Sequence, residues 1–197
     1  GKQRGVIAAV LRGLLSLLSI VYSLVIRLRN GLYNLGLKKA FKPDADSISV
    51  GNITTGGTGK TPVVAFLTNW FAERGLQVAI LSRGYKSLDS GENDEKLVLD
   101  RLCPGVPHFQ NPDRIASAKR AIAEHHAQVL VLDDAFQHRR LARSLDLVLI
   151  DATNPWGFGH LLPRGLLREP KSELSRADLI LITRSDQVEP AHLEHLS

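Results

Sequence analysis

A glycine-rich segment between two apolar stretches places the strongest constraint on how this chain folds. Residues 49–64 read SVGNITTGGTGKTPVV. A β-prone stretch, residues 47–50, begins just ahead of the glycines, and residues 61–73 carry apolar side chains at helical spacing. Pro62 falls in the first turn of that predicted helix, where the missing N–H costs nothing. Strand, glycine loop and helix in this order predict a site for phosphate groups.

The loop departs from the signature G-x-x-x-x-G-K-[ST] at one position, because Thr54 stands where the signature begins with glycine. The chemistry is otherwise present: backbone N–H groups to surround phosphate oxygens, an ammonium group from Lys60 and a hydroxyl for magnesium from Thr61. The alternative is a glycine-rich turn that binds nothing. The predicted nucleotide-binding residues are Thr54, Thr55, Gly56, Gly57, Thr58, Gly59, Lys60 and Thr61.

Charge is distributed unevenly along the 197 residues, which carry a net charge of +5. Residues 1–43 contain eight basic and no acidic side chains, which leaves 17 basic against 20 acidic side chains in the remainder. A slightly acidic body argues against a nucleic-acid partner, and the basic segment favours contact with anionic lipid. We therefore predict a membrane-associating helix and linker in residues 1–43 and a nucleotide-binding domain in residues 44–197, with no obligate protein partner.

The most apolar run of the chain, residues 6–26, lies within the basic segment. Its 21 residues suffice to span a bilayer as a helix. Polar residues at spacings of three and four form one stripe along that helix, which favours an amphipathic helix lying in the membrane interface. The stripe consists of Arg12, Ser16, Ser19, Ser23 and Arg27. Two alternatives remain: a cleaved signal peptide, and a stripe that rests on the chain's own domain or on a partner while the leucines contact lipid.

Past the loop, strand-like and helix-like segments alternate. The sequence predicts strands at 77–82, 128–132, 146–150 and 177–183, and a helix at 114–126. This pattern indicates an α/β fold of the P-loop NTPase type, with a mostly parallel sheet flanked by helices. Two long stretches rich in Gly, Pro and charge, residues 84–112 and 153–171, are predicted to be loops. Loops at the carboxyl ends of parallel strands form the site in such sheets.

A pair of carboxylates follows one of the predicted strands. Asp133 and Asp134 come directly after four apolar residues, where one of them can hold magnesium directly or through water. The alternative is that one of them caps the next helix. His138, four residues on, either orients a group in the site or is solvated beside its arginine neighbours.

Four motifs in a fixed order resemble one known family. They are GNITTGGTGKTP, SRGY at residues 82–85, DDAFQHRRLAR at 133–143 and LLPRGLLREP at 161–170. Together they resemble the tetraacyldisaccharide 4′-kinase family, the lipid A 4′-kinases of Gram-negative bacteria. The resemblance implies an enzyme at the cytoplasmic face of the inner membrane, peripheral or monotopic. It implies transfer of the ATP γ-phosphate, with Mg²⁺, to the 4′-hydroxyl of a tetraacylated disaccharide 1-phosphate.

The resemblance also implies roles for individual residues. Lys60 would contact the β- and γ-phosphates, and Asp94, in the sequence Asn-Asp-Glu-Lys, would be the base for the sugar hydroxyl, although the family's flanking glycine and proline are absent. Lys60, Asp94 and Asp134 are thus the predicted catalytic residues. The predicted metal site comprises Thr61, Asp133, Asp134 and Glu169, and the candidates for substrate contact are Arg83, Tyr85, His138 and Arg168.

A second departure from the family's pattern is the length of the chain. Members of the family are longer and carry a C-terminal lobe with a histidine, so we interpret this chain as a fragment or a short form whose activity alone is in doubt. The rival hypothesis is a membrane-associated regulatory ATPase of the partitioning type, but that group has lysine before the glycine pair, where this chain has Thr55. A third class, a nucleotide-sensing anchor without a transferable substrate, would lack the acidic pair Asp94 and Glu95.

Overall fold

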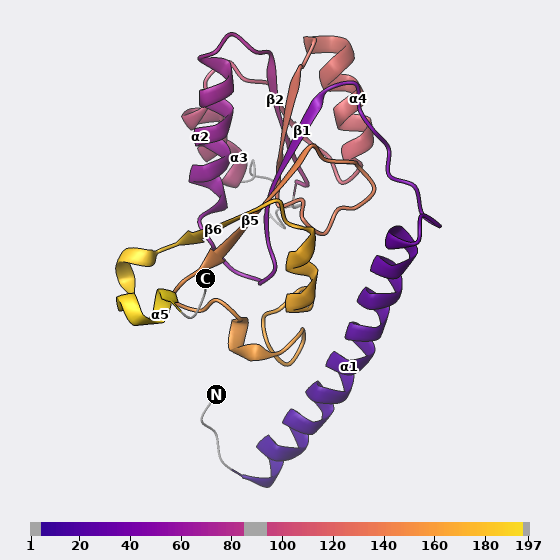
Figure 1. Ribbon diagram of the computed structural model, residues 1–197, viewed down its shortest axis with the longest axis vertical. Helices are drawn as coiled ribbons and strands as arrows, with labels where there is room; N and C mark the ends of the chain where they lie inside the picture. The colour runs from indigo at the N-terminus through magenta and orange to yellow at the C-terminus, as the bar shows by residue number, and fades with distance from the viewer. Residues whose placement is uncertain (1–4, 85–93, 195–197) are drawn as a thin grey trace.

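A computed structural model of the chain describes residues 5–84 and 94–194, and Figure 1 shows a sheet with helices on both faces and one long helix along the side. The sheet has the strand order β3-β2-β4-β1-β5-β6, and every neighbouring pair is parallel. The strands are β1 (Asp46–Asn52), β2 (Val78–Ser82), β3 (His108–Gln110), β4 (Val129–Asp133), β5 (Leu145–Asp151) and β6 (Leu179–Thr183). The α-helices are α1 (Val6–Asn34), α2 (Lys60–Ala72), α3 (Asp94–Leu102), α4 (Arg114–His125) and α5 (Pro190–Glu194). The α/β fold predicted from the sequence is confirmed.

The helices divide between the two faces of the sheet, as in Figure 1. On one face, α2 and α3 cover Val50, Ile80 and Val131, all within one buried cluster. On the other, α4 packs its alanines against the alternate residues of β2 and β4. Burial on both faces explains why the central strands read as unbroken apolar runs rather than as alternating ones.

The prediction that residues 84–112 form a loop is wrong at residues 94–102 and 108–110, which form α3 and β3. Glycine, proline and charged residues dominate the composition of this stretch, so its few apolar residues do not stand out as a helix pattern. Two of them nevertheless lie in the core, since Leu99 and Cys103 are each 1% exposed. Strand β3 has three residues, all of them half-buried, so it lacks the continuous apolar pattern of a central strand.

A third apolar cluster supports the long segment between β5 and β6. Ile53, Phe136, Val148 and Leu167 form it. The segment returns to the glycine loop, because Leu167 makes an isolated bridge with Thr54 and the Arg168 N–H donates to the Ile53 carbonyl at 2.7 Å. The motif at 161–170 therefore lies against the start of the glycine loop.

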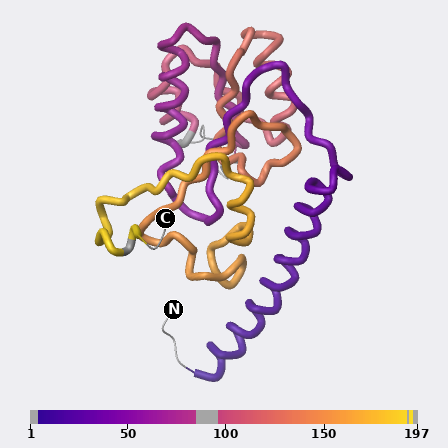
Figure 2. Tube along the Cα trace, in the orientation of Figure 1, coloured from indigo at the N-terminus to yellow at the C-terminus, as the bar shows by residue number. Residues whose placement is uncertain are grey.

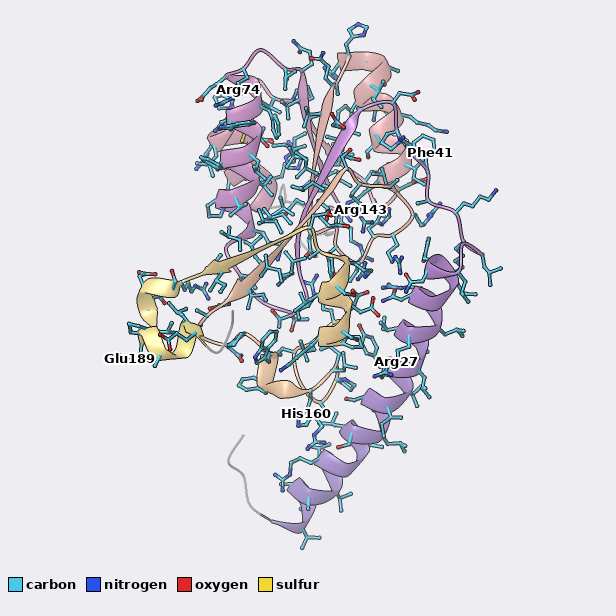
Figure 3. The ribbon with its side chains drawn as sticks, viewed as in Figure 1. Arg27, Phe41, Arg74, Arg143, His160 and Glu189 are labelled. Carbon is cyan, nitrogen blue, oxygen red and sulfur yellow. The ribbon has the colours of Figure 1, made fainter. Side chains whose placement is uncertain are left out.

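Helix α1 runs along the side of the domain, separate from the sheet, and the trace in Figure 2 shows its course. It is long and apolar enough to cross a membrane by length and composition. One side bears twelve apolar residues that are each at least 46% exposed: Val6, Ile7, Val10, Leu11, Leu14, Leu17, Leu18, Ile20, Val21, Leu24, Val25 and Leu28. In Figure 3, Arg27 marks α1 on one side of the view and Arg74 marks the end of α2 on the other.

The other side of α1 contacts the domain through polar groups. The Ser19 hydroxyl donates to the Leu161 carbonyl at 3.0 Å, and the Tyr22 hydroxyl donates to the Arg168 carbonyl at 2.9 Å. Arg12 and Arg27 of the predicted stripe are exposed, whereas Ser19 faces the protein. The alternative in which the polar stripe rests on the domain thus holds for Ser19 but not for the stripe as a whole.

Candidate phosphate-transfer site

The glycine loop joins the end of β1 to the start of α2. Gly56 and Gly59 adopt φ values of +116° and +81°, which favour glycine, and α2 begins at the next residue, Lys60. The end of β6 fixes the loop from the other side: the Thr183 hydroxyl donates to the Thr58 carbonyl at 3.0 Å, and Arg184 donates to the Gly57 carbonyl at 2.8 Å. The N–H groups at the start of α2 remain available to an anion, as the sequence predicts.

Lys60 and Asp134 bring the two predicted motifs together. The Lys60 Nζ lies 3.2 Å from Asn52 Oδ1 and 3.6 Å from Asp134 Oδ1. Arg168 Nη1 donates to both carboxylate oxygens of Asp134 at 2.8 Å. Burial raises the pKa of Asp134, but Lys60 and Arg168 outweigh burial and hold that pKa below its usual range. Asp134 is therefore ionised at neutral pH.

These residues line a cavity of about 510 Å³ at the carboxyl ends of the strands. Of the sequence-predicted residues, it brings together Gly56, Gly57, Thr58, Gly59, Lys60, Thr61, Arg83, Asp133, Asp134 and Arg168. Open parallel sheets bind their ligands at this end. A volume of this size and a rim of cationic groups suit a nucleotide phosphate chain.

The donor set at the cavity fits a magnesium ion that shares its ligands with phosphate and water. Thr61, Asp133 and Asp134 all line the cavity and supply oxygen ligands, which Mg²⁺ prefers. Within residues 5–84 and 94–194, no group of three His, Cys, Asp or Glu side chains comes together as a metal site. A magnesium ion here would therefore take its remaining ligands from phosphate oxygens and water, as Mg²⁺ commonly does.

Glu169, predicted as part of the metal site, does not line this cavity. Its side chain is fully buried, with one carboxylate oxygen paired with Arg29 of α1 and the other with Arg176. Asn30 also donates to it at 3.4 Å. With both oxygens engaged by arginines, Glu169 joins α1 to the domain. Burial raises the pKa of Glu169, and the two arginines act against that rise.

Thr54 and Thr55, predicted as part of the nucleotide site, do not line this cavity, whereas Gly56 to Thr61 do. Thr54 is buried in the bridge to Leu167. The Thr55 N–H donates to the Leu166 carbonyl at 2.7 Å. The backbone at the first signature position therefore pairs with the 161–170 segment.

A second cavity, of about 620 Å³, adjoins the first on the side of α1. Arg83, Asp134 and Arg168 line both cavities, so the two meet at these side chains. Tyr22 and Ile26 of α1 form part of the wall of the second. Five arginines line it: Arg29, Arg83, Arg114, Arg140 and Arg168.

His138 lines the second cavity and is held neutral. Burial, together with the positive charges of Arg114, Arg140 and Arg143, lowers the pKa of His138 to about 4. The Nε2 atom is buried without a hydrogen-bond partner in the described structure. Of the two roles that the sequence allows, orientation of a group in a site fits this placement, because a solvated histidine would not be desolvated.

Two predicted residues are described in part or not at all. Asp94 begins α3, and its side chain lies outside the described structure, as does Tyr85 entirely. Several lining residues were not predicted: Arg29, Arg114 and Tyr22 of the second cavity, and Arg184 at the loop. Arginine in a helix gives no sequence signal for such a role, and Tyr22 reads as one more apolar residue of α1.

Comparisons with known proteins agree on one family. The family model described as LpxK, tetraacyldisaccharide-1-P 4′-kinase, matches residues 11–196. A tetraacyldisaccharide 4′-kinase of Halothermothrix orenii is 41% identical over 201 residues, which cover 93% of this chain and 52% of that protein. Another from Desulfatibacillum aliphaticivorans is 42% identical over 203 residues, covering 94% of this chain and 54% of that protein. The chain thus spans about half the length of the curated relatives it matches.

A solved structure agrees with these relatives. LpxK from Aquifex aeolicus, crystallised in complex with ATP, superposes with a TM-score of 0.81 at 36% identity, over 91% of this chain and 61% of that chain. The signal recognition particle receptor FtsY of Elizabethkingia anophelis shares the fold alone, with a TM-score of 0.52 at 16% identity over 77% of this chain and 56% of that chain.

Proposed function

The chain belongs to the tetraacyldisaccharide 4′-kinase family, and we propose that it carries the nucleotide site of such a kinase and works at a membrane surface. In this proposal the γ-phosphate of ATP passes to the 4′-hydroxyl of a tetraacyldisaccharide 1-phosphate, a step of lipid A biosynthesis, at the cytoplasmic face of the inner membrane. The observation that carries the proposal is the meeting of two cavities at Asp134 and Arg168, one at the glycine loop and one beside α1.

The loop cavity supplies the donor side. Backbone N–H groups at the start of α2 and the Lys60 ammonium would bind the β- and γ-phosphates, as in other phosphate loops. Thr61, Asp133 and Asp134 would hold Mg²⁺, which when bound neutralises charge on the phosphates. The Lys60 ammonium lies near the Asp134 carboxylate. When ATP binds, the ammonium would pair with phosphate oxygens in place of part of its interaction with Asp134.

The second cavity suits the acceptor. Its arginines favour an anionic headgroup, since a guanidinium donates two parallel hydrogen bonds to phosphate. Tyr22 and Ile26 place one wall of this cavity on α1. The exposed leucines and valines of the same helix would lie in the lipid interface, so that a substrate with acyl chains reaches the cavity without leaving the membrane.

Asp94 is the proposed base for the acceptor hydroxyl. It begins α3, and two further residues of that helix, Lys96 and Leu99, line the loop cavity. A carboxylate within hydrogen-bond reach of the attacking hydroxyl accelerates transfer, although positioning and charge neutralisation provide most of phosphoryl-transfer catalysis. These two residues support the proposal that Asp94 acts at the loop cavity.

The test has two stages, because the relatives are longer than this chain. Binding of Mg-ATP is measured first by calorimetry on the chain. Transfer of labelled γ-phosphate to detergent-dispersed tetraacyldisaccharide 1-phosphate is then measured for the chain and for an Asp94→Ala variant. Asp44→Ala, at an exposed carboxylate, is the matched control. Transfer that falls at least about 100-fold in Asp94→Ala and not in the control supports the proposal. Absence of ATP binding would overturn it.

A further inference from the structure

Three side chains in the wall of the loop cavity form a hydroxyl, imidazole and carboxylate chain that the proposed lipid transfer does not use. Ser82 Oγ lies 2.9 Å from His108 Nε2, and His108 Nδ1 lies 2.9 Å from Asp100 Oδ1. Lys96 Nζ donates to the other oxygen of Asp100 at 2.5 Å. A nucleophile, a base and a group that orients the base are recognised by this geometry and not by their order in the chain.

The elements that carry these residues converge on the cavity. Ser82 ends β2, His108 begins β3, and Asp100 lies on α3. Ser82, His108 and Lys96 all line the loop cavity. The His108 side chain is 2% exposed, so the imidazole is shielded from solvent, whereas the Asp100 side chain is 34% exposed. The base of the proposed chain is therefore buried, and the carboxylate that holds it is partly open to solvent.

The protonation states of His108 and Asp100 are those needed to activate the Ser82 hydroxyl. Burial lowers the pKa of His108, even though Asp100 raises it, so the imidazole is neutral at neutral pH. Burial raises the pKa of Asp100, but hydrogen bonds from Lys96 and His108 outweigh burial and leave the carboxylate ionised. With the proton on Nδ1, His108 donates to Asp100, and its Nε2 accepts from Ser82.

Register places the Ser82 hydroxyl beside the predicted magnesium carboxylate. Leu81 pairs with Leu132, so Ser82 lies level with Asp133 on the neighbouring strand. Residues level with one another on adjacent parallel strands, about 4.8 Å apart, point to the same face. A nucleotide whose phosphates share a metal with Asp133 would therefore bring its terminal phosphate close to Ser82.

We propose that Ser82 is a self-phosphorylation site, with His108 as its base and Asp100 as the residue that positions the base. The inference rests on the proposed function for the supply of ATP. The Ser82 oxygen forms a bond to the γ-phosphorus while the bond to the bridging β,γ-oxygen breaks. ADP leaves with that electron pair, and the hydroxyl proton passes to His108 Nε2. The product is a phosphoserine in the wall of the loop cavity.

Phosphorylation of Ser82 would reduce binding of ATP in the loop cavity, where the reaction takes place. A phosphoserine carries nearly two negative charges at neutral pH, and Lys96 also lines this wall. The new charge would occupy space in the cavity and repel the terminal phosphate of a second ATP. We therefore expect the phosphorylated chain to bind ATP more weakly than the unmodified chain does.

The experiment incubates the chain with Mg²⁺ and γ-labelled ATP, without lipid, and locates phosphate by mass spectrometry. We expect phosphate on Ser82, a rate per molecule that is independent of protein concentration, and no signal from Ser82→Ala. His108→Gln should slow the reaction at least about 100-fold, the lower range for removal of a general base. Ser175→Ala, at an exposed serine, is the control that should change nothing.

Calorimetry with Mg-ATP on the same samples separates this proposal from the one it rests on. ATP binding without phosphate on Ser82 overturns self-phosphorylation and leaves the proposed function standing. Absence of ATP binding overturns both. Phosphate on Ser82 at an unchanged rate in His108→Gln overturns the assignment of the base, and a Ser82→Thr variant, which keeps a hydroxyl, checks that loss of signal in Ser82→Ala is not a folding defect.

Discussion

Asp134 and Glu169 are both carboxylates held by arginines, yet they lie in two regions with opposite properties. Asp134 faces the loop cavity with a side chain that is 19% exposed, and its pKa lies below the usual range. Glu169 is 0% exposed between α1 and the domain, and its pKa is raised. The open carboxylate suits a site where a ligand and a metal exchange with solvent. The closed one suits a fixed joint, because no ligand can reach it.

The largest effect that would test this contrast is on stability. In Glu169→Gln the two arginines lose their buried partner, and removing one member of a buried pair costs about 3–5 kcal/mol. We expect the free energy of unfolding, measured by urea denaturation, to fall by about that amount. Glu173→Gln, which removes a partner of Arg176 from a less buried carboxylate, should cost less than about 1 kcal/mol. Equal losses would contradict the assignment of Glu169 as the joint.

The neutral His138 of the second cavity predicts that the free energy of unfolding depends on pH, by an amount similar to the loss expected for Glu169→Gln. The pKa of His138 is lowered to about 4 from 6.5, so the unfolded chain binds a proton first as pH falls. The contribution of the neutral imidazole to the free energy of unfolding is complete above pH 6.5 and is lost as the pH falls toward 4. At 1.36 kcal/mol per pKa unit, this contribution amounts to about 3 kcal/mol. NMR titration of the imidazole and unfolding of a His138→Gln variant measure it. An imidazole that titrates near 6.5 would contradict the prediction.

Lys60→Ala should weaken Mg-ATP binding without unfolding the chain. A hydrogen bond to a charged group contributes about 1.5–3 kcal/mol, so the dissociation constant from calorimetry should rise about 10- to 150-fold. Lys42→Ala, an exposed lysine outside the loop cavity, is the control. An unchanged dissociation constant would place the nucleotide elsewhere.

The smallest expected effect is on membrane binding. Leu17 is 59% exposed on the apolar side of α1, and its burial in lipid contributes roughly 1.5 kcal/mol. Leu17→Ser should therefore reduce binding to vesicles of anionic phospholipid about tenfold in a sedimentation assay. Phe66→Ser, at an exposed apolar residue of α2, serves as the control. Equal losses in both variants would show that the lipid contact is not confined to α1.

Sequence reasoning succeeded where local pattern and site coincide. The glycine loop, Lys60 and the carboxylates after β4 were predicted together, because parallel strands bring their carboxyl ends to one edge and the residues that follow must meet there. The central strands were predicted nearly to the residue, since burial on both faces requires continuous apolar runs.

Where the structure differs from the prediction at the site, the difference lies in the direction of a side chain and not in its position along the chain. Arg168 and Glu169 are neighbours in one motif, but Arg168 points to Asp134 while Glu169 points to α1. A sequence motif places both near the site and cannot say which side chain faces it. Likewise, the spacing of Ser19 predicted a polar side of α1, and only the tertiary contact with Leu161 shows what that side touches.

The central claim is that the carboxylates of the loop cavity, Asp133 and Asp134, serve the metal and that Glu169 does not. The most direct test compares the magnesium dependence of ATP binding in Asp133→Asn and Glu169→Gln. Calorimetry with and without Mg²⁺ is run at low temperature on samples whose folded state is checked by circular dichroism. The account predicts that Asp133→Asn loses most of the gain in affinity that Mg²⁺ provides, whereas folded Glu169→Gln keeps it. Loss of the magnesium dependence in Glu169→Gln, with Asp133→Asn unaffected, would contradict it.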